Sequence, residues 1–170
     1  MSYIIRVDDR LLHGQVVEGW IKPLNIDKIV VCSDLVACDI VEKTLFEIST
    51  PKHVKLECNT IVFTAENLTK GIYDKESVLI LVSSLEELYS LVLETRKIVA
   101  DYVFPAVNIG GIRYCEGKKQ VYKALCLNKN EINIIRKLND LGIILEYYLL
   151  PSDTKIVLNN IINEIEKIIE

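Results

Sequence analysis

The chain has little of several features that mark common classes of protein. It contains two histidines, one methionine and one tryptophan among 170 residues, with 20 basic side chains against 24 acidic ones. The resulting net charge of -4 argues against nucleic acid as the main partner. The longest apolar run, residues 78–82, is far too short to span a bilayer, and residues 1–6 show no signal-peptide pattern. We therefore expect a cytoplasmic protein, for which any role in transport is peripheral, at the inner face of the membrane.

Motifs for metals, nucleotides and disulfides are also missing. The five cysteines form no C-x-x-C pair, and neither histidine lies at zinc-ligand spacing from them. An odd number of cysteines fits a reducing compartment better than a disulfide scaffold. No P-loop or G-x-G-x-x-G spacing occurs, so we expect neither a metal nor any other cofactor. Cys115, beside a glycine-rich stretch, is interpreted as a structural thiol, and a Cys115–His13 hydrolase is a distant alternative.

Apolar strand-like segments alternate with helical patterns along the whole chain. Because these segments are rich in Val, Ile and Leu and mostly do not alternate with polar residues, they predict a sheet covered on both faces. The order predicts an α/β fold, an open, doubly wound, mostly parallel sheet in a single domain spanning residues 1–170. The predicted strands are residues 4–7, 28–32, 54–58, 78–82, 103–109, 121–126 and 143–149.

Helix starts are marked by capping residues between these strands. Ser33 is expected to cap a helix that ends near residue 48, and Ser84 and Asn128 each precede a glutamate by three residues, as in a capping box. A final helix is predicted to open at residues 151–153. Residues 110–119 break the rhythm and predict a loop or hairpin.

The most informative segment is residues 7–15, with the sequence VDDRLLHGQ. It places His13 between the first predicted strand and the first predicted helix, three residues after Arg10. Backbone N–H groups, the positive end of a helix, a guanidinium and a nucleophilic ring nitrogen would meet at that point. These are the parts required to hold a phosphoryl group on a histidine.

Each neighbour of His13 has an expected role in that hypothesis. Gly14 lets the backbone approach an oxygen atom, and Arg10 offers a two-pronged contact to the phosphoryl group. Asp9 restrains Arg10 or accepts a ring N–H, which selects the attacking nitrogen. Gln15 caps the helix or donates to the anion. The residues alone leave a second interpretation open, in which His13 only caps or packs and residues 8–10 form a solvated turn.

The motifs RVDDRLLHGQV at residues 6–16 and NIGG at 108–111, with EGKKQV at 116–121, resemble those of a known family. It is the B component (enzyme IIB) of the mannose–fructose–sorbose family of bacterial sugar phosphotransferase systems. The resemblance covers essentially the whole chain and includes the LPSD segment at 150–153. It implies an open sheet of parallel strands with one antiparallel edge strand and helices on both faces.

The resemblance also implies a function and a set of partners. A protein-histidine–sugar phosphotransferase of this kind takes a phosphoryl group from a IIA component and carries it on Nδ1 of its own loop histidine. That histidine aligns with His13, and Arg10 aligns with an arginine that helps to hold the phosphate. The group then passes to sugar arriving through membrane IIC and IID permease components. The alternative is a regulatory phosphorelay protein of an incomplete system without sugar transport. The residues leave a homodimer open.

Overall fold

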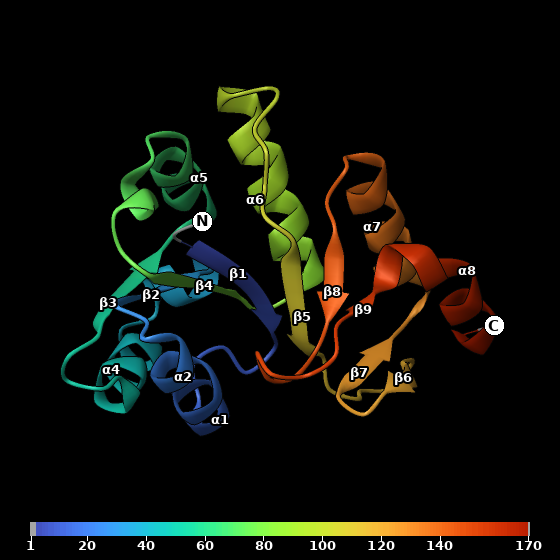
Figure 1. Cartoon of the computed structure of the whole chain (residues 1–170), viewed down its shortest axis with the longest axis horizontal. Coiled ribbons are helices and arrows are strands. Elements are labelled where there is room, and N and C mark those ends of the chain that lie inside the picture. Colours follow the sequence, from blue (N-terminus) through green and yellow to red (C-terminus); the bar gives the residue numbers. More distant parts are fainter. Residues whose placement is uncertain (1–2, 170) are drawn as a thin grey trace.

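A seven-stranded, mostly parallel sheet forms the centre of the molecule, with the order β3-β2-β4-β1-β5-β8-β9 (Figure 1). The structure is a computed structural model that describes residues 3–169. Residues 1 and 2 of the opening segment and residue 170 lie outside the described part. Five adjacent strand pairs are parallel, and β9 pairs antiparallel with β8 at one edge. The strands are β1 (Tyr3–Asp8), β2 (Lys28–Cys32), β3 (Lys55–Asn59), β4 (Val78–Val82), β5 (Val107–Gly111), β8 (Leu145–Tyr147) and β9 (Ile156–Val157).

Helices cover both faces of the sheet. One face carries α5, α6, α7 and α8, and the other carries the helical segment from α1 to α2 together with α3 and α4 (Figure 1). Within one strand, alternate residues serve the two cores: Ile80 belongs to the first, and Leu79 and Leu81 to the second. The helices are α1 (Gly14–Val16), the π-helical η1 (Val17–Ile21), α2 (Lys22–Leu24), α3 (Asp34–Cys38), α4 (Ile40–Ser49), α5 (Ile61–Thr69), the 3₁₀ turn η2 (Ile72–Asp74), α6 (Leu85–Ile98), α7 (Lys129–Asp140) and α8 (Leu158–Ile169).

The predicted fold class is confirmed. The alternating pattern required a parallel sheet covered on both faces, and the antiparallel edge strand that the resemblance implied is β9. The full capping box at Asn128 and Glu131 forms as predicted. At Ser84 the box is half formed, because Glu87 binds the backbone N–H and hydroxyl of Ser83 instead.

Three local predictions were wrong. Residues 121–126 are not one strand but part of a hairpin of β6 (Lys119–Tyr122) and β7 (Leu125–Leu127) outside the main sheet. The helix predicted from residue 33 breaks at Asp39, whose side chain accepts hydrogen bonds from Val41 and Glu42 and starts α4. Residues 151–155 do not open the last helix: the backbone N–H of Asp153 donates to the Leu150 carbonyl in a turn, and β9 precedes α8.

The connections place a crevice beside the carboxyl end of β1. The chain leaves β1 toward β2 on one side of the sheet and leaves β5 toward β8 on the other. This reversal makes the neighbouring ends of β1 and β5 the topological switch point, where open α/β sheets bind their ligands. Within residues 3–169, no helix is both long and apolar enough to cross a membrane.

Candidate phosphoryl-transfer site

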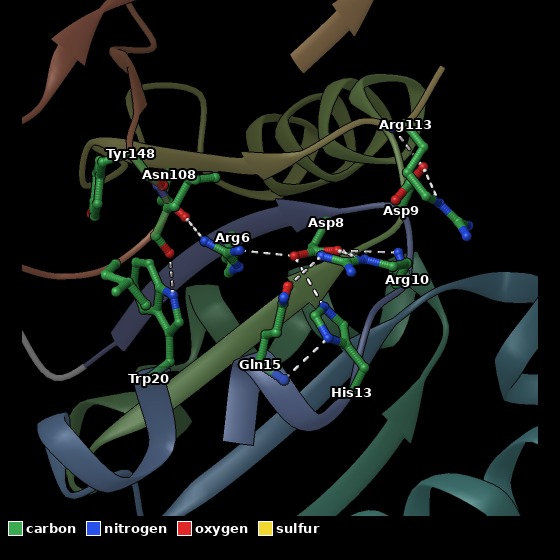
Figure 2. Close-up of polar contacts among 12 residues, drawn as sticks. Arg6, Asp8, Asp9, Arg10, His13, Gln15, Trp20, Asn108, Arg113 and Tyr148 are labelled. Atoms are coloured by element: carbon green, nitrogen blue, oxygen red, sulfur yellow. Dashed lines mark hydrogen bonds and ion pairs between the residues drawn. The ribbon is translucent and has the colours of Figure 1, made fainter. Parts of the chain in front are cut away.

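His13 lies in the loop between β1 and α1, at the switch point (Figure 2). Its backbone is extended, and it serves as the N-cap of α1. The Gln15 backbone N–H donates to Nδ1 over 3.3 Å, and Nε2 lies 3.4 Å from Asp8 Oδ2. An amide N–H can only donate and a carboxylate can only accept, so both neighbours select the tautomer with its proton on Nε2. The Nδ1 lone pair therefore faces the helix start, and the imidazole side chain remains 19% exposed.

Asp8 is the residue that holds this ring, and its side chain is fully buried. It ends β1, where it also accepts from Arg6 Nη2 at 2.8 Å and from the Arg10 backbone N–H at 3.2 Å. Burial alone would raise the pKa of the Asp8 carboxyl, but the hydrogen bonds from His13 and Arg6 and the Arg6 charge together hold that pKa below its usual value. Asp8 is therefore a carboxylate at neutral pH.

The expected role of Asp9 was wrong. We predicted that Asp9 restrains Arg10 or accepts a hydrogen bond from the His13 ring. In the structure Asp8 contacts both Arg10 and His13. Asp9 Oδ2 instead accepts from the backbone N–H of Arg113 at 2.8 Å and from its Nε at 3.0 Å. Asp8 is the last residue of β1 and Asp9 the first residue of the following turn, and their side chains bind different partners. Asp8 is buried, so the alternative of a solvated turn with a surface ion pair holds only for residues 9 and 10, where Asp9 pairs with the exposed Arg113.

Behind Asp8, a buried arginine is enclosed by three elements. The Arg6 side chain is 5% exposed, its Nη1 donates to Asn108 Oδ1 on β5, and its guanidinium lies 4.6 Å above the Trp20 ring. A Cβ atom at Gly110 would lie 1.9 Å from Arg6 Cζ, so only glycine leaves room for this group. The NIGG motif is thus part of a strand that shapes the site, and not a turn. Trp20 is a core residue, as expected, and its indole N–H donates to the Leu149 carbonyl.

Arg10 and Gln15 lie together at the mouth of the site. Arg10 Nη2 donates to Gln15 Oε1 at 3.1 Å, and Arg10 Nε lies 3.5 Å from Asp8 Oδ1. The loop between them is strained, because Leu11 has a φ of +52° and is not a glycine. Gly14 stands at the helix start with no atom within 4 Å of where its Cβ would be. The structure therefore brings Arg10, His13, Gly14 and Gln15 into one loop, and Asp9 lies beside it.

A cavity of about 910 Å³ opens next to this loop. Arg6, Asp9, Arg10 and Gln15 line it, together with the end of β5 and the β6–β7 hairpin. Arg6 Nε, Arg10 Nε and Asp9 Oδ1 are buried without a hydrogen-bond partner among the described residues. Two of these three groups are guanidinium donors, so an anion entering the cavity would satisfy them.

Neither the second histidine nor the cysteines compete for this position. His53 is exposed beyond the C-terminal end of α4, as expected for a surface residue. Cys115 is exposed, and neither it nor His13 is among the residues that line the cavity. Cys126 lines it, but burial raises the pKa of its thiol, which disfavours the nucleophilic thiolate.

This fold and site define the class of open α/β proteins that carry a loop histidine at the switch point of the sheet. The model of the family described as "PTS system sorbose subfamily IIB component" matches residues 2–170. The chain belongs to this family, which confirms the resemblance that its motifs indicated.

Individual relatives agree with that assignment. The chain is 31% identical to the sorbose-specific EIIB component of Klebsiella pneumoniae over 95% of this chain and 94% of that protein. It is 34% identical to the mannose-specific EIIAB component of Escherichia coli K12, over 96% of this chain but about half (49%) of the relative's length. The crystal structure of the IIBSor domain of the sorbose permease from Klebsiella pneumoniae superimposes with a TM-score of 0.82 at 30% identity, covering 96% of this chain and 98% of that one.

Proposed function

We propose that this chain is the phosphocarrier IIB component of a sugar phosphotransferase system of the mannose–fructose–sorbose type. It accepts a phosphoryl group from a IIA component on Nδ1 of His13. It then passes the group to a sugar that arrives through membrane IIC and IID components, and it works at the cytoplasmic side of the membrane. The observation that supports this most is the position of the His13 ring, which has the Asp8 carboxylate beside Nε2 and the Gln15 amide beside Nδ1. From these two neighbours we infer the tautomer with its proton on Nε2.

The first transfer needs only positioning and charge. The Nδ1 lone pair attacks the phosphorus atom of the donor phosphohistidine, and the donor P–N bond breaks with its electron pair returning to the donor ring. As Nδ1 gains a bond, the His13 ring becomes more positive, and the Asp8 carboxylate 3.4 Å from Nε2 stabilises that charge. No proton has to move in this step.

The loop also offers partners for the new phosphoryl oxygens. Once Nδ1 carries phosphorus, it no longer accepts from the Gln15 amide, so that N–H becomes free to donate to an oxygen of the phosphoryl group. Arg10 Nε makes no hydrogen bond among the described residues, although it lies 3.5 Å from Asp8 Oδ1. Gly14, at the start of α1, leaves open space nearby in the sequence. Donors fixed in advance in this way stabilise developing charge without reorganisation.

The second transfer reverses the chemistry. A sugar hydroxyl attacks the phosphorus atom and releases its proton to solvent. The Nδ1–P bond breaks, and its electron pair returns to Nδ1. Curated relatives are named for mannose, sorbose and fructose, which supports a hexose as the acceptor. Catalysis in both directions rests on alignment and electrostatic stabilisation.

Site mapping tests the proposal directly. The protein is incubated with a phosphorylated IIA component, and the modified residue is located by mass spectrometry under conditions that preserve phosphohistidine. We expect acid-labile phosphate on His13, abolished by His13→Ala and retained by the matched control His53→Ala. Phosphate on His53, on a serine or on Cys126 would overturn the assignment of His13.

A further inference from the structure

One buried amide side chain lies between the His13 site and the edge of the sheet formed by β8 and β9. Asn108 is fully buried in β5, where its backbone is in register with Arg6 of β1 and with Glu146 of β8. Its Nδ2 donates to the Tyr148 carbonyl at 2.9 Å, and its Oδ1 accepts from Arg6 Nη1. Burying an amide is costly unless its polar atoms are bound, and here both ends of the amide have a partner.

These two partners fix the orientation of the amide. A backbone carbonyl can only accept and a guanidinium can only donate, so Nδ2 must face Tyr148 and Oδ1 must face Arg6. A leucine of similar size would bind neither partner, and an aspartate would turn a second acceptor toward the carbonyl oxygen. Asparagine therefore suits this position by its chemistry as well as by its size.

The amide begins a series of contacts that ends at His13 (Figure 2). Arg6 Nη1 binds Asn108, Arg6 Nη2 donates to Asp8 Oδ2 at 2.8 Å, and the same oxygen lies 3.4 Å from His13 Nε2. Because different partners hold the two Nη groups of Arg6, the guanidinium cannot turn about its Nε–Cζ bond without losing both contacts. Arg6 lines the cavity, and its buried Nε has no hydrogen-bond partner among the described residues.

Tyr148 holds the other end of this series in two ways. Its carbonyl binds Asn108, and its ring stacks on Trp20 with 5.5 Å between the ring centroids. The guanidinium of Arg6 in turn lies 4.6 Å from the centroid of the Trp20 ring. The segment after β8 therefore restrains Arg6 through Asn108 at one Nη group and through Trp20 at one face of the guanidinium.

We propose that Asn108 is a positioning residue for phosphoryl transfer. It holds the Arg6 guanidinium in the orientation that compensates Asp8 and leaves Nε free, and through Asp8 it positions the His13 ring. The inference rests on the proposed phosphocarrier function, because it gives Asn108 a role in that reaction. Asn108 is fully buried and cannot touch a partner protein. Its effect should therefore fall on the rate of transfer and not on binding of the IIA component.

Rapid-quench kinetics over a range of concentrations of phosphorylated IIA component test this role. For Asn108→Ala we expect the maximal rate to fall roughly 10- to 100-fold, as for other small displacements of catalytic groups, with the half-saturating concentration unchanged. The matched control is Val107→Ala, which truncates a fully buried neighbour in the same strand and should leave the maximal rate unchanged. A wild-type maximal rate in Asn108→Ala, or a change in the half-saturating concentration alone, would overturn the proposal.

A double-mutant cycle shows whether Asn108 acts through Arg6. Arg6→Lys cannot bridge Asn108 and Asp8 as the planar guanidinium does, so Asn108→Ala should slow the Arg6→Lys variant by less than about twofold. Losses that add in the double variant would leave Asn108 with a structural role only and would refute positioning through Arg6. If Asn108→Ala does not fold, Asn108→Asp keeps the size of the side chain, and its carboxylate should draw Arg6 away from Asp8 and slow transfer in the same way.

NMR of the unphosphorylated protein distinguishes failure of this inference from failure of the proposed function. In the wild type the two Nη groups of Arg6 should give separate signals, because each is held by a different partner, and in Asn108→Ala these signals should merge. Merged signals in the wild type would overturn the inference and leave the phosphocarrier function intact. Phosphate on a residue other than His13 would refute the proposed function, and this role with it, while the Arg6 signals stay separate.

Discussion

At the residue scale, Asp8 at the end of β1 connects the other side chains of the site. It is fully buried and contacts Arg6, Arg10 and His13, so one carboxylate compensates a buried cation and orients the imidazole. Two arginines in this part of the structure present the free donors for an anion. We therefore expect the Asp8 carboxylate to orient the His13 ring and the two arginines to bind oxygen atoms of the phosphoryl group.

Replacing Asp8 should affect stability in a pH-dependent way. Asp8→Asn leaves Arg6 buried without its counter-ion, which we expect to lower the free energy of unfolding by about 3 kcal/mol at pH 7. The folded-state pKa of Asp8 is depressed, so its contribution is complete above the unfolded pKa of about 3.9 and is lost as the pH falls through the folded value. Urea titrations that extend from pH 7 to about pH 2 should show the two proteins converging only below the unfolded pKa of about 3.9. A constant difference would mean that Asp8 acts by packing alone.

Replacing Arg10 separates charge from geometry. Arg10→Lys keeps the positive charge but loses the planar fork that donates to Gln15 and presents the free Nε. Loss of one charge-assisted hydrogen bond, worth about 1.5 to 3 kcal/mol, should slow phosphoryl transfer roughly 10- to 100-fold. Rapid-quench kinetics with a phosphorylated IIA component measure the rate, and Arg136→Lys on α7 is the remote control. An unchanged rate would make Arg10 a surface charge only.

At the scale of elements, the site depends on how closely β1 and β5 approach. Gly110 on β5 leaves the space that the Arg6 guanidinium on β1 occupies. We expect Gly110→Ala to push Arg6 off Asp8, to lower the free energy of unfolding by about 1 to 3 kcal/mol, and to slow transfer.

Gly14→Ala provides the contrast to Gly110→Ala. A Cβ at Gly14 meets nothing in the free protein, so its stability should not fall and should rise by up to about 1 kcal/mol. Transfer should still slow, because the methyl group would occupy the approach of the phosphoryl oxygens. Urea denaturation measures the free energy of unfolding of both glycine variants. An equal decrease in the two would contradict this account of β5.

The same scale shows how far the sequence predicts the structure. The strands at residues 28–32 and 78–82 were predicted with their observed bounds, because an apolar run between polar residues marks a buried parallel strand. The break at Asp39 was missed because the hydrophobic pattern continues across it, although an aspartate three residues before Glu42 is a capping signal. The β6–β7 hairpin was read as one strand because its turn contains Lys123 and Ala124 and no glycine.

The positions of the main site residues could be predicted from the sequence. The hydrogen bonds and ion pairs between them could not. The loop histidine and the nearby arginine could be found from residue types and their order. Which of two adjacent aspartates faces His13 depends on the pleat of β1 and on Asn108 and Gly110, which are about a hundred residues away. No local pattern contains that information. The orienting role of Asp8 and the enclosed Arg6 therefore emerged only from the structure.

At the scale of the whole molecule, the sheet brings distant segments to a single edge. The His13 loop follows β1, the wall of the cavity comes from β5 and the hairpin after it, and Leu149, Leu150 and Asp153 close it from the segment after β8. We therefore expect phosphoryl chemistry to take place at this one edge of the sheet.

Phosphoryl transfer to His13 should require neither metal nor nucleotide, because of the way in which charge is distributed over this edge. Asp8 and Asp9 could suggest a magnesium site, but Asp8 pairs with Arg6 and Asp9 pairs with Arg113. A cation would have to displace these guanidinium groups. The protein's own amides and arginines can instead neutralise the phosphoryl group. Transfer from a purified phosphorylated IIA component should keep its full rate in excess EDTA and without ATP. If chelation stopped the isolated step and magnesium restored it, the mechanism would be wrong even with His13 as the acceptor.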